Sequence, residues 1–207
     1  MSNKSQKIMS GPHPKLILAS RSPARRKLLK KLGLPFTCVT SKFKEDMTAH
    51  PNPRRLARIL ALGKAEFVAD RLDDFARTDA VIIGADTFIM VEGNKLGKPR
   101  TRAQAREMIA AMSGKTITVL TGVAVIKTNA KALVAKKLTT CVSTKIKIKK
   151  MTATEIKFLA SQADTLNISG GFSIEGAGSH VIEKVDGDID NVIGLPLFKL
   201  REMLKKI

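Results

Sequence analysis

The sequence contains no tryptophan, no tyrosine, only two cysteines and no long apolar run. Proteins that bind single-stranded nucleic acids stack the bases on aromatic side chains, so the missing residue types weaken that interpretation. The two cysteines, Cys38 and Cys141, are too few for a disulfide framework, so we expect a reduced, cytoplasmic protein. No stretch of about 18 apolar residues occurs, so no membrane-spanning helix is expected.

Acidic residues are also scarce. Asp and Glu number 18 against 37 Lys and Arg, which gives a formal net charge of +19 at pH 7. A field of this sign attracts polyanions such as nucleic acid, an anionic membrane or a nucleotide. The charge by itself does not choose among these partners, and a lysine-rich solvated surface is an alternative explanation.

Length and hydrophobic content indicate one folded domain. The chain has 207 residues, of which 43% are hydrophobic, enough for a core of ordinary size. Residues 1–14 are polar and lack the apolar run of a secretion signal, so we expect a short disordered arm there. No linker rich in Pro, Gly or Ser divides the rest, so residues 15–207 are expected to form a single domain.

The pattern of apolar and polar residues predicts an α/β fold with a mixed sheet. Residues 15–19 and 80–85 are short apolar runs, which are typical of buried strands. Ser22 followed by Pro23 is typical of a helix N-terminus, and Thr152 and Glu155 have the spacing of a capping box. The other expected elements are strands over 36–40, 88–91, 116–127, 133–149 and 180–185, and helices over 53–71, 101–112 and after Pro196.

The segment from Ser20 to Arg26 lies where an expected strand leads into an expected helix. Free N–H groups at the helix start, two hydroxyls and nearby guanidinium groups together favour anion binding. Ser20 and Arg25 are therefore candidate phosphate ligands. An ordinary capped helix with a solvated basic face is the alternative interpretation.

Two acidic residues follow expected strands. Asp86 comes directly after the apolar run at 80–85, and ligands in open α/β sheets bind beyond the carboxyl ends of strands. Asp86 could therefore hold Mg²⁺ or accept a proton from water, although it could also only bond turn N–H groups. Glu45 is a candidate second metal ligand, or a surface charge paired with neighbouring lysines.

Two lysines are candidate phosphate ligands. Lys98 lies in a loop held by Gly97 and Pro99, and Lys64 lies in the middle of the helix expected over 53–71. An ammonium group acts as a point charge for phosphate, although a single lysine is usually only solvated.

A series of short motifs follows the chain in order. They include Ser20-x-Ser22-Pro23-x-Arg25, Gly84-Ala85-Asp86-Thr87 and Leu96-Gly97-Lys98-Pro99, and together they occupy residues 16–25, 32–36, 83–87, 96–99, 113–116, 121–124, 170–176 and 192–197. Each motif is weak alone, but in this order they closely resemble the Maf family of nucleoside-triphosphate pyrophosphatases. The resemblance runs from about residue 15 to the C-terminus.

This resemblance implies an elongated, two-lobed mixed sheet flanked by helices with a central nucleotide cleft. It implies hydrolysis of a nucleoside triphosphate between the α and β phosphates, a divalent metal (Mg²⁺ or Mn²⁺), a cytoplasmic location, removal of non-canonical nucleotides and a possible homodimer. By position, Asp86 matches the family's proton acceptor. The other matching active-site residues are Ser20, Arg25, Glu45, Lys64 and Lys98. We expect Glu45 and Asp86 to hold the metal.

Three positions that the resemblance links to base choice disagree. Ala24 stands where many members have the first of two arginines, and Thr87 is more typical of the pyrimidine branch. Glu175 instead resembles the 7-methyl-GTP branch, because a carboxylate can accept hydrogen bonds from the N–H edge of guanine. From Glu175 we expect a modified purine in preference to dTTP or UTP.

A different class of function remains open at this point. The net charge of +19 also suits a non-catalytic nucleic-acid-binding or cell-division (septum) regulatory protein. Such a protein has no use for buried carboxylates beside a basic loop, so the sequence favours the enzyme.

Overall fold

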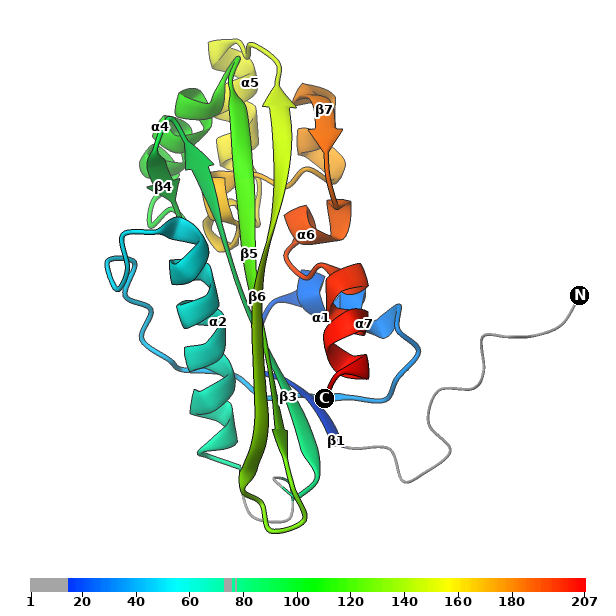
Figure 1. Ribbon diagram of the computed structural model, residues 1–207. Coiled ribbons are helices and arrows are strands. Elements are labelled where there is room, and N and C mark those ends of the chain that lie inside the picture. The colour runs from blue at the N-terminus through cyan, green and yellow to red at the C-terminus, as the bar shows by residue number, and fades with distance from the viewer. Residues whose placement is uncertain (1–14, 73–75, 77) are drawn as a thin grey trace, which may run out of the picture.

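The computed structural model describes residues 15–72, 76 and 78–207. The arm expected over residues 1–14 lies outside the described residues. Three long strands, β3 (Ala80–Val91), β5 (Thr116–Thr128) and β6 (Val134–Ile148), run along the molecule with helices on both sides (Figure 1).

The strands of the described residues form one mixed sheet of seven strands. The remaining four are β1 (Lys15–Leu18), β2 (Thr37–Cys38), β4 (Asn94–Leu96) and β7 (Ile182–Asp186). The order is β2-β1-β3-β5-β6-β7, with β4 paired to β3. β1 runs parallel to β2 and β3, and the other pairs are antiparallel. The expected α/β class with a mixed sheet is therefore confirmed.

Two helices begin at the capping residues identified in the sequence. In α1 (Pro23–Lys30), the hydroxyl of Ser22 accepts a hydrogen bond from the backbone N–H of Arg25. In α5 (Ala153–Ser161), Thr152 and Glu155 form the expected capping box. The other helices are α2 (Pro53–Ala69), α4 (Arg102–Met112), α6 (Ile189–Ile193) and α7 (Leu197–Lys205), with 3₁₀ turns η1 (Thr165–Asn167), η2 (Ser169–Gly171) and η3 (Gly176–Val181).

The middle of the sheet differs from the sequence prediction. The strands expected over 80–85 and 88–91 form the single strand β3, which pairs with β5 without a break from Val81 to Met90. Backbone pairing does not depend on side-chain polarity, so Asp86 and Thr87 do not interrupt it. The strand expected over 36–40 is shortened to Thr37–Cys38, because it pairs with only two residues of β1.

The buried core divides between the two ends of the long strands. At one end, α4 and α5 cover the sheet, and Ile109 and Leu159 lie in that core. At the other end, α1 and α7 pack on one face and α2 on the opposite face (Figure 1). This arrangement agrees with the expected two lobes. Among the described residues, none of the helices combines the length and apolar character needed to cross a bilayer.

Candidate active site

Asp86 lies in the middle of β3, not beyond its end as expected, because β3 continues along β5. On the other side of β3, the pairing with β1 ends at Ile83, and that with β4 begins only at Ile89. Within the described chain, no strand therefore lies beside residues 84–88 on that side. Asp86, with 5% of its surface exposed, occupies this gap between the two lobes.

Lys64 of α2 connects the two candidate acidic residues. Its Nζ donates to Asp86 Oδ1 at 2.5 Å and lies 2.8 Å from Glu45 Oε1. The side chains of Lys64 and Asp86 are almost buried, whereas that of Glu45 is about half exposed. The structure thus brings Asp86, Glu45 and Lys64 together, as the resemblance implies.

Two glycines allow α2 to lie this close to the sheet. A Cβ on Gly122 would lie 1.9 Å from the carbonyl oxygen of Ala57, and a Cβ on Gly84 would lie 2.2 Å from that of Ala61. Gly122 is also the strand partner of Asp86. The close approach at these glycines therefore sets how near Lys64 comes to the carboxylate.

The loop after β2 carries Glu45 to the site. It is held against α2 by Phe43, whose ring occupies the space where a Cβ on Gly63 would lie. Burial raises the pKa of Glu45, but the charges of Lys64, Lys98 and Arg25 outweigh that effect and leave the pKa below its ordinary value. Glu45 is therefore ionised at neutral pH and available as an anionic ligand.

Arg25 faces the same gap from α1. Its Nε donates to the carbonyl of Gly194 at 2.8 Å, and Nη2 donates to Thr87 Oγ1 at 3.0 Å. Burial lowers its pKa, while the charges of Asp86 and Glu45 oppose that shift. The guanidinium remains charged, since arginine titrates far above neutral pH.

Lys98 and Ser20 lie at the border of this cluster. Partial burial, together with the charges of Arg25 and Lys64, lowers the pKa of Lys98. Its loop is held to η2 by a hydrogen bond from the N–H of Gly170 to the carbonyl of Gly97. Ser20 is buried just after β1, where its hydroxyl accepts a hydrogen bond from the N–H of Ser22.

The three specificity positions are not equally close to the cluster. Thr87 follows Asp86 in β3 and bonds Arg25 directly. Ala24 precedes Arg25 on α1 and is half-buried. Glu175 is exposed and lines a separate hollow of about 350 Å³ with residues at the end of α5, among them Gln162 and Asp164.

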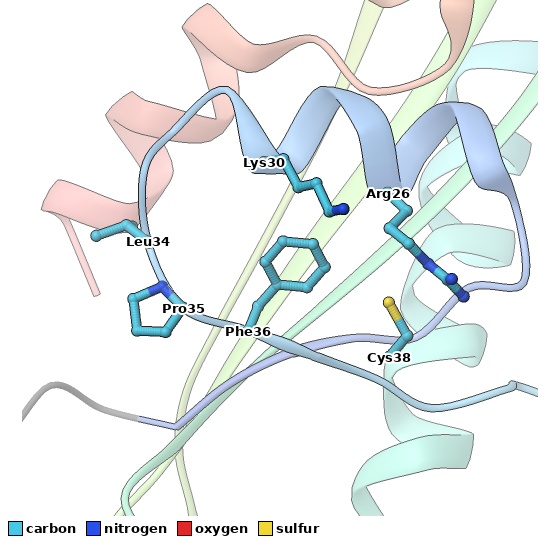
Figure 2. A pocket seen from close by; sticks show the side chains of 6 residues that line it. All are labelled: Arg26, Lys30, Leu34, Pro35, Phe36 and Cys38. Carbon is cyan, nitrogen blue, oxygen red and sulfur yellow. The ribbon is translucent and has the colours of Figure 1, made fainter.

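A larger hollow, of about 410 Å³, lies between α1 and the segment over residues 34–38. Arg26, Lys30, Phe36 and Cys38 point into it (Figure 2). None of the candidate site residues lines it, because Arg25 faces β3 and Gly194. The concave surface therefore lies apart from the chemical cluster, which the ion pairs and buried polar groups define.

The sequence did not indicate the residues whose hydrogen bonds hold Thr87, the partner of Arg25. Thr121 and Asn191 are fully buried, and the hydroxyl of Thr121 bonds both Thr87 and the backbone of Asn191. Ser169 of η2 donates to the carbonyl of Thr87. Nothing in the sequence distinguished Thr121 from the other threonines of β5, which are Thr116, Thr118 and Thr128.

Comparison with known families adds an independent observation. A family described as "Maf-like protein" matches residues 15–207. The chain belongs to the Maf family. Proteins similar to the chain include those named dTTP/UTP pyrophosphatase from Moorella thermoacetica (40% identical over 92% of this chain and 93% of the relative), Thermoanaerobacter sp. strain X514 (36%, 93% and 96%) and Bacillus anthracis strain CDC 684 (36%, 93% and 95%).

Membership of the Maf family confirms the resemblance drawn from the ordered motifs. The mixed α/β fold is consistent with this membership. The names of these relatives do not support the purine preference that we expected from Glu175.

Proposed function

We propose that this chain is a nucleoside-triphosphate pyrophosphatase that hydrolyses dTTP and UTP to the nucleoside monophosphate and pyrophosphate. The observation that carries the proposal is the cluster in which Lys64 lies between Asp86 and Glu45, with Arg25 close by. Cations suited to a triphosphate surround a nearly buried carboxylate there, which is the combination that hydrolysis of a phosphoanhydride needs. The names of relatives at 36–40% identity support the pyrimidine substrates.

Asp86 is the residue best placed to activate water. Its Oδ1 accepts from Lys64, and within the described chain Oδ2 receives no hydrogen bond. Oδ2 can therefore orient a water molecule and take its proton as the water oxygen attacks the α-phosphorus. The bond from that phosphorus to the bridging oxygen then breaks, and pyrophosphate leaves.

Basic side chains would bind the triphosphate. Arg25 uses two of its N–H groups within the protein, and its remaining N–H groups have no hydrogen-bond partner in the described chain. Guanidinium groups suit phosphate oxygens because they donate in a fixed, forked geometry. Lys98 and Lys64 add point charges. Ser20 follows Ala19, whose N–H donates to the carbonyl of Ile83 at the edge of the same gap.

Asp86 and Glu45 also fit a divalent cation such as Mg²⁺ or Mn²⁺. Mg²⁺ sites in phosphoryl-transfer enzymes commonly use one or two carboxylates together with substrate phosphates and waters. The described residues contain no group of three or more His, Cys, Asp or Glu side chains that could hold a metal ion, so substrate phosphates and waters would have to supply the remaining ligands. When bound, the cation would offset the negative charge that builds up on the phosphates.

Thr87 supports the choice of a pyrimidine over the purine expected from Glu175. Thr87 lies inside the cluster and is the residue type that resembles the pyrimidine branch. Glu175 lines a hollow that contains none of the cluster residues. Thr87 and the names of the relatives therefore support a pyrimidine nucleotide as the substrate.

The test is pyrophosphate release from dTTP, UTP, CTP, GTP and 7-methyl-GTP with Mg²⁺ or Mn²⁺. Asp86→Asn should lower kcat by ~100- to 10,000-fold, the usual contribution of a general base, and leave nucleotide binding intact. Asp70→Asn, an exposed aspartate just after α2, is the matched control. Turnover by Asp86→Asn equal to that of the unmodified chain would contradict the role of Asp86, and a preference for 7-methyl-GTP would contradict the proposed substrates.

A further inference from the structure

A continuous line of hydrogen bonds connects Arg25 to helix α6 through two strands. Arg25 Nη2 donates to Thr87 Oγ1 at 3.0 Å, and Thr87 Oγ1 lies 2.9 Å from Thr121 Oγ1. Thr121 Oγ1 in turn donates to the backbone carbonyl of Asn191 at 2.9 Å. Thr121 and Asn191 each have 0% of their surface exposed, so water does not compete for these groups.

Counting protons fixes the direction of every bond in this line. A hydroxyl carries one proton, and the carbonyl of Asn191 can only accept, so the proton of Thr121 is committed to that carbonyl. The contact between the two hydroxyls therefore needs the proton of Thr87, and Thr87 donates to Thr121. Since Arg25 is purely a donor, the oxygen of Thr87 accepts from it, and the line is consistent throughout.

Helix α6, where this series of hydrogen bonds ends, is itself held to the sheet by further hydrogen bonds. The side-chain Nδ2 of Asn191 donates to the carbonyl of Val119 in β5 and to Thr144 Oγ1 in β6. Thr144 donates in turn to the carbonyl of Asp188, which precedes α6. Gly194, which follows α6, supplies the second acceptor of Arg25. Both attachments of the guanidinium thus depend on the same anchored element.

We propose that Thr121 is a positioning residue that holds the guanidinium of Arg25, through Thr87, in the orientation used for the triphosphate. The inference rests on the proposed function only where turnover is measured. The direction of the Thr87 hydrogen bond also limits how Thr87 can influence base choice. The one proton of Thr87 is already used, so Thr87 cannot donate to a base and would affect substrate preference only by placing Arg25.

A kinetic double-mutant cycle tests the proposal. Thr121→Val keeps the shape and removes the hydroxyl, and it should lower kcat/KM for dTTP about tenfold, the upper range for one hydrogen bond. In an Arg25→Lys background, which lacks the forked donor, the same substitution should change kcat/KM less than about twofold. Thr121→Ser, which restores the hydroxyl, should recover most of the loss.

Thr128→Val is the matched control. Thr128 is also a fully buried threonine of β5, and its hydroxyl bonds the backbone of Ala80 at the far end of the strand. This variant should lose stability and keep its kcat/KM. An equal loss from Thr121→Val in both backgrounds, or an equal loss from Thr128→Val, would overturn the positioning role.

A second measurement does not require turnover. The Arg25 Nε–H proton, observed by NMR and assigned with Arg25→Lys, should exchange with solvent several-fold faster in Thr121→Val and at the unmodified rate in Thr128→Val. An unchanged rate in Thr121→Val would overturn the proposal. If the unmodified chain hydrolyses no nucleotide, the proposed function fails, and this exchange rate still decides whether Thr121 holds Arg25.

Discussion

Gly122→Ala should disrupt the geometry of the active site although it changes no charged residue. The added Cβ would lie 1.9 Å from the carbonyl oxygen of Ala57 in α2, whereas ordinary contacts begin at 3.4 Å. The helix must therefore move outward by about 1.5 Å or the strand must distort, because both contacting groups are backbone. Overpacking of this kind costs roughly 3 kcal/mol, which corresponds to a Tm lower by about 6–12 °C for a chain of this size.

The substitution should also lower turnover in the molecules that remain folded. Lys64 is carried by α2 and contacts Asp86, the strand partner of Gly122, so the displacement acts directly on that ion pair. A misplacement of about 1 Å in a catalytic arrangement can lower turnover by roughly 100-fold. We therefore expect kcat for dTTP to fall by about two orders of magnitude at temperatures where the variant is still folded.

The assay is pyrophosphate release with thermal unfolding followed in parallel. Gly97→Ala adds the same methyl group where nothing lies within 4 Å, so its Tm should be unchanged. If Gly122→Ala retained both the Tm and the kcat of the unmodified chain, the close packing of α2 would not set the geometry of the site, and this reasoning would be refuted.

Three further predictions concern charged side chains. Glu45→Gln should raise the Mg²⁺ concentration needed for half-maximal turnover roughly tenfold or more, because it removes a charged contact worth ~1.5–3 kcal/mol. A metal titration measures this concentration, and an unchanged value would exclude Glu45 as a ligand. Because the pKa of Lys98 lies below its ordinary value of 10.5, kcat/KM should fall as the pH rises through that lowered pKa. Lys98→Arg, which keeps its charge, should move this alkaline decline to higher pH, and identical pH profiles would contradict the assignment. Replacing the exposed Lys145 and Lys147 by Gln should leave kcat/KM within about twofold, since β6 carries them outside the cluster, and a large loss in the same assay would implicate them in the site.

Local features of the sequence were sufficient for the elements and their order. Caps such as Ser22 and Thr152 predicted helix starts because they act within three residues along the chain. The apolar runs predicted the strands, but not that Asp86 lies inside one. The position of Asp86 inside β3 depends on the partner strand β5, which pairs with β3 beyond Ala85 as far as Met90.

The residue types of the site were also recognisable in order along the chain, and this order identified the family. Which of them meet was decided by tertiary structure. Lys64 reaches Asp86 across 22 residues only because Gly84 and Gly122 admit α2 to the sheet, and Arg25 reaches the carbonyl of Gly194 across 169 residues. The proposed role of Thr121 also depends on tertiary structure. The direction of its hydrogen bonds is defined only because Thr87 and Asn191 lie on either side of its hydroxyl. Sequence specifies local conformation and chemistry, whereas contacts between distant segments depend on strand register and on how closely the elements pack.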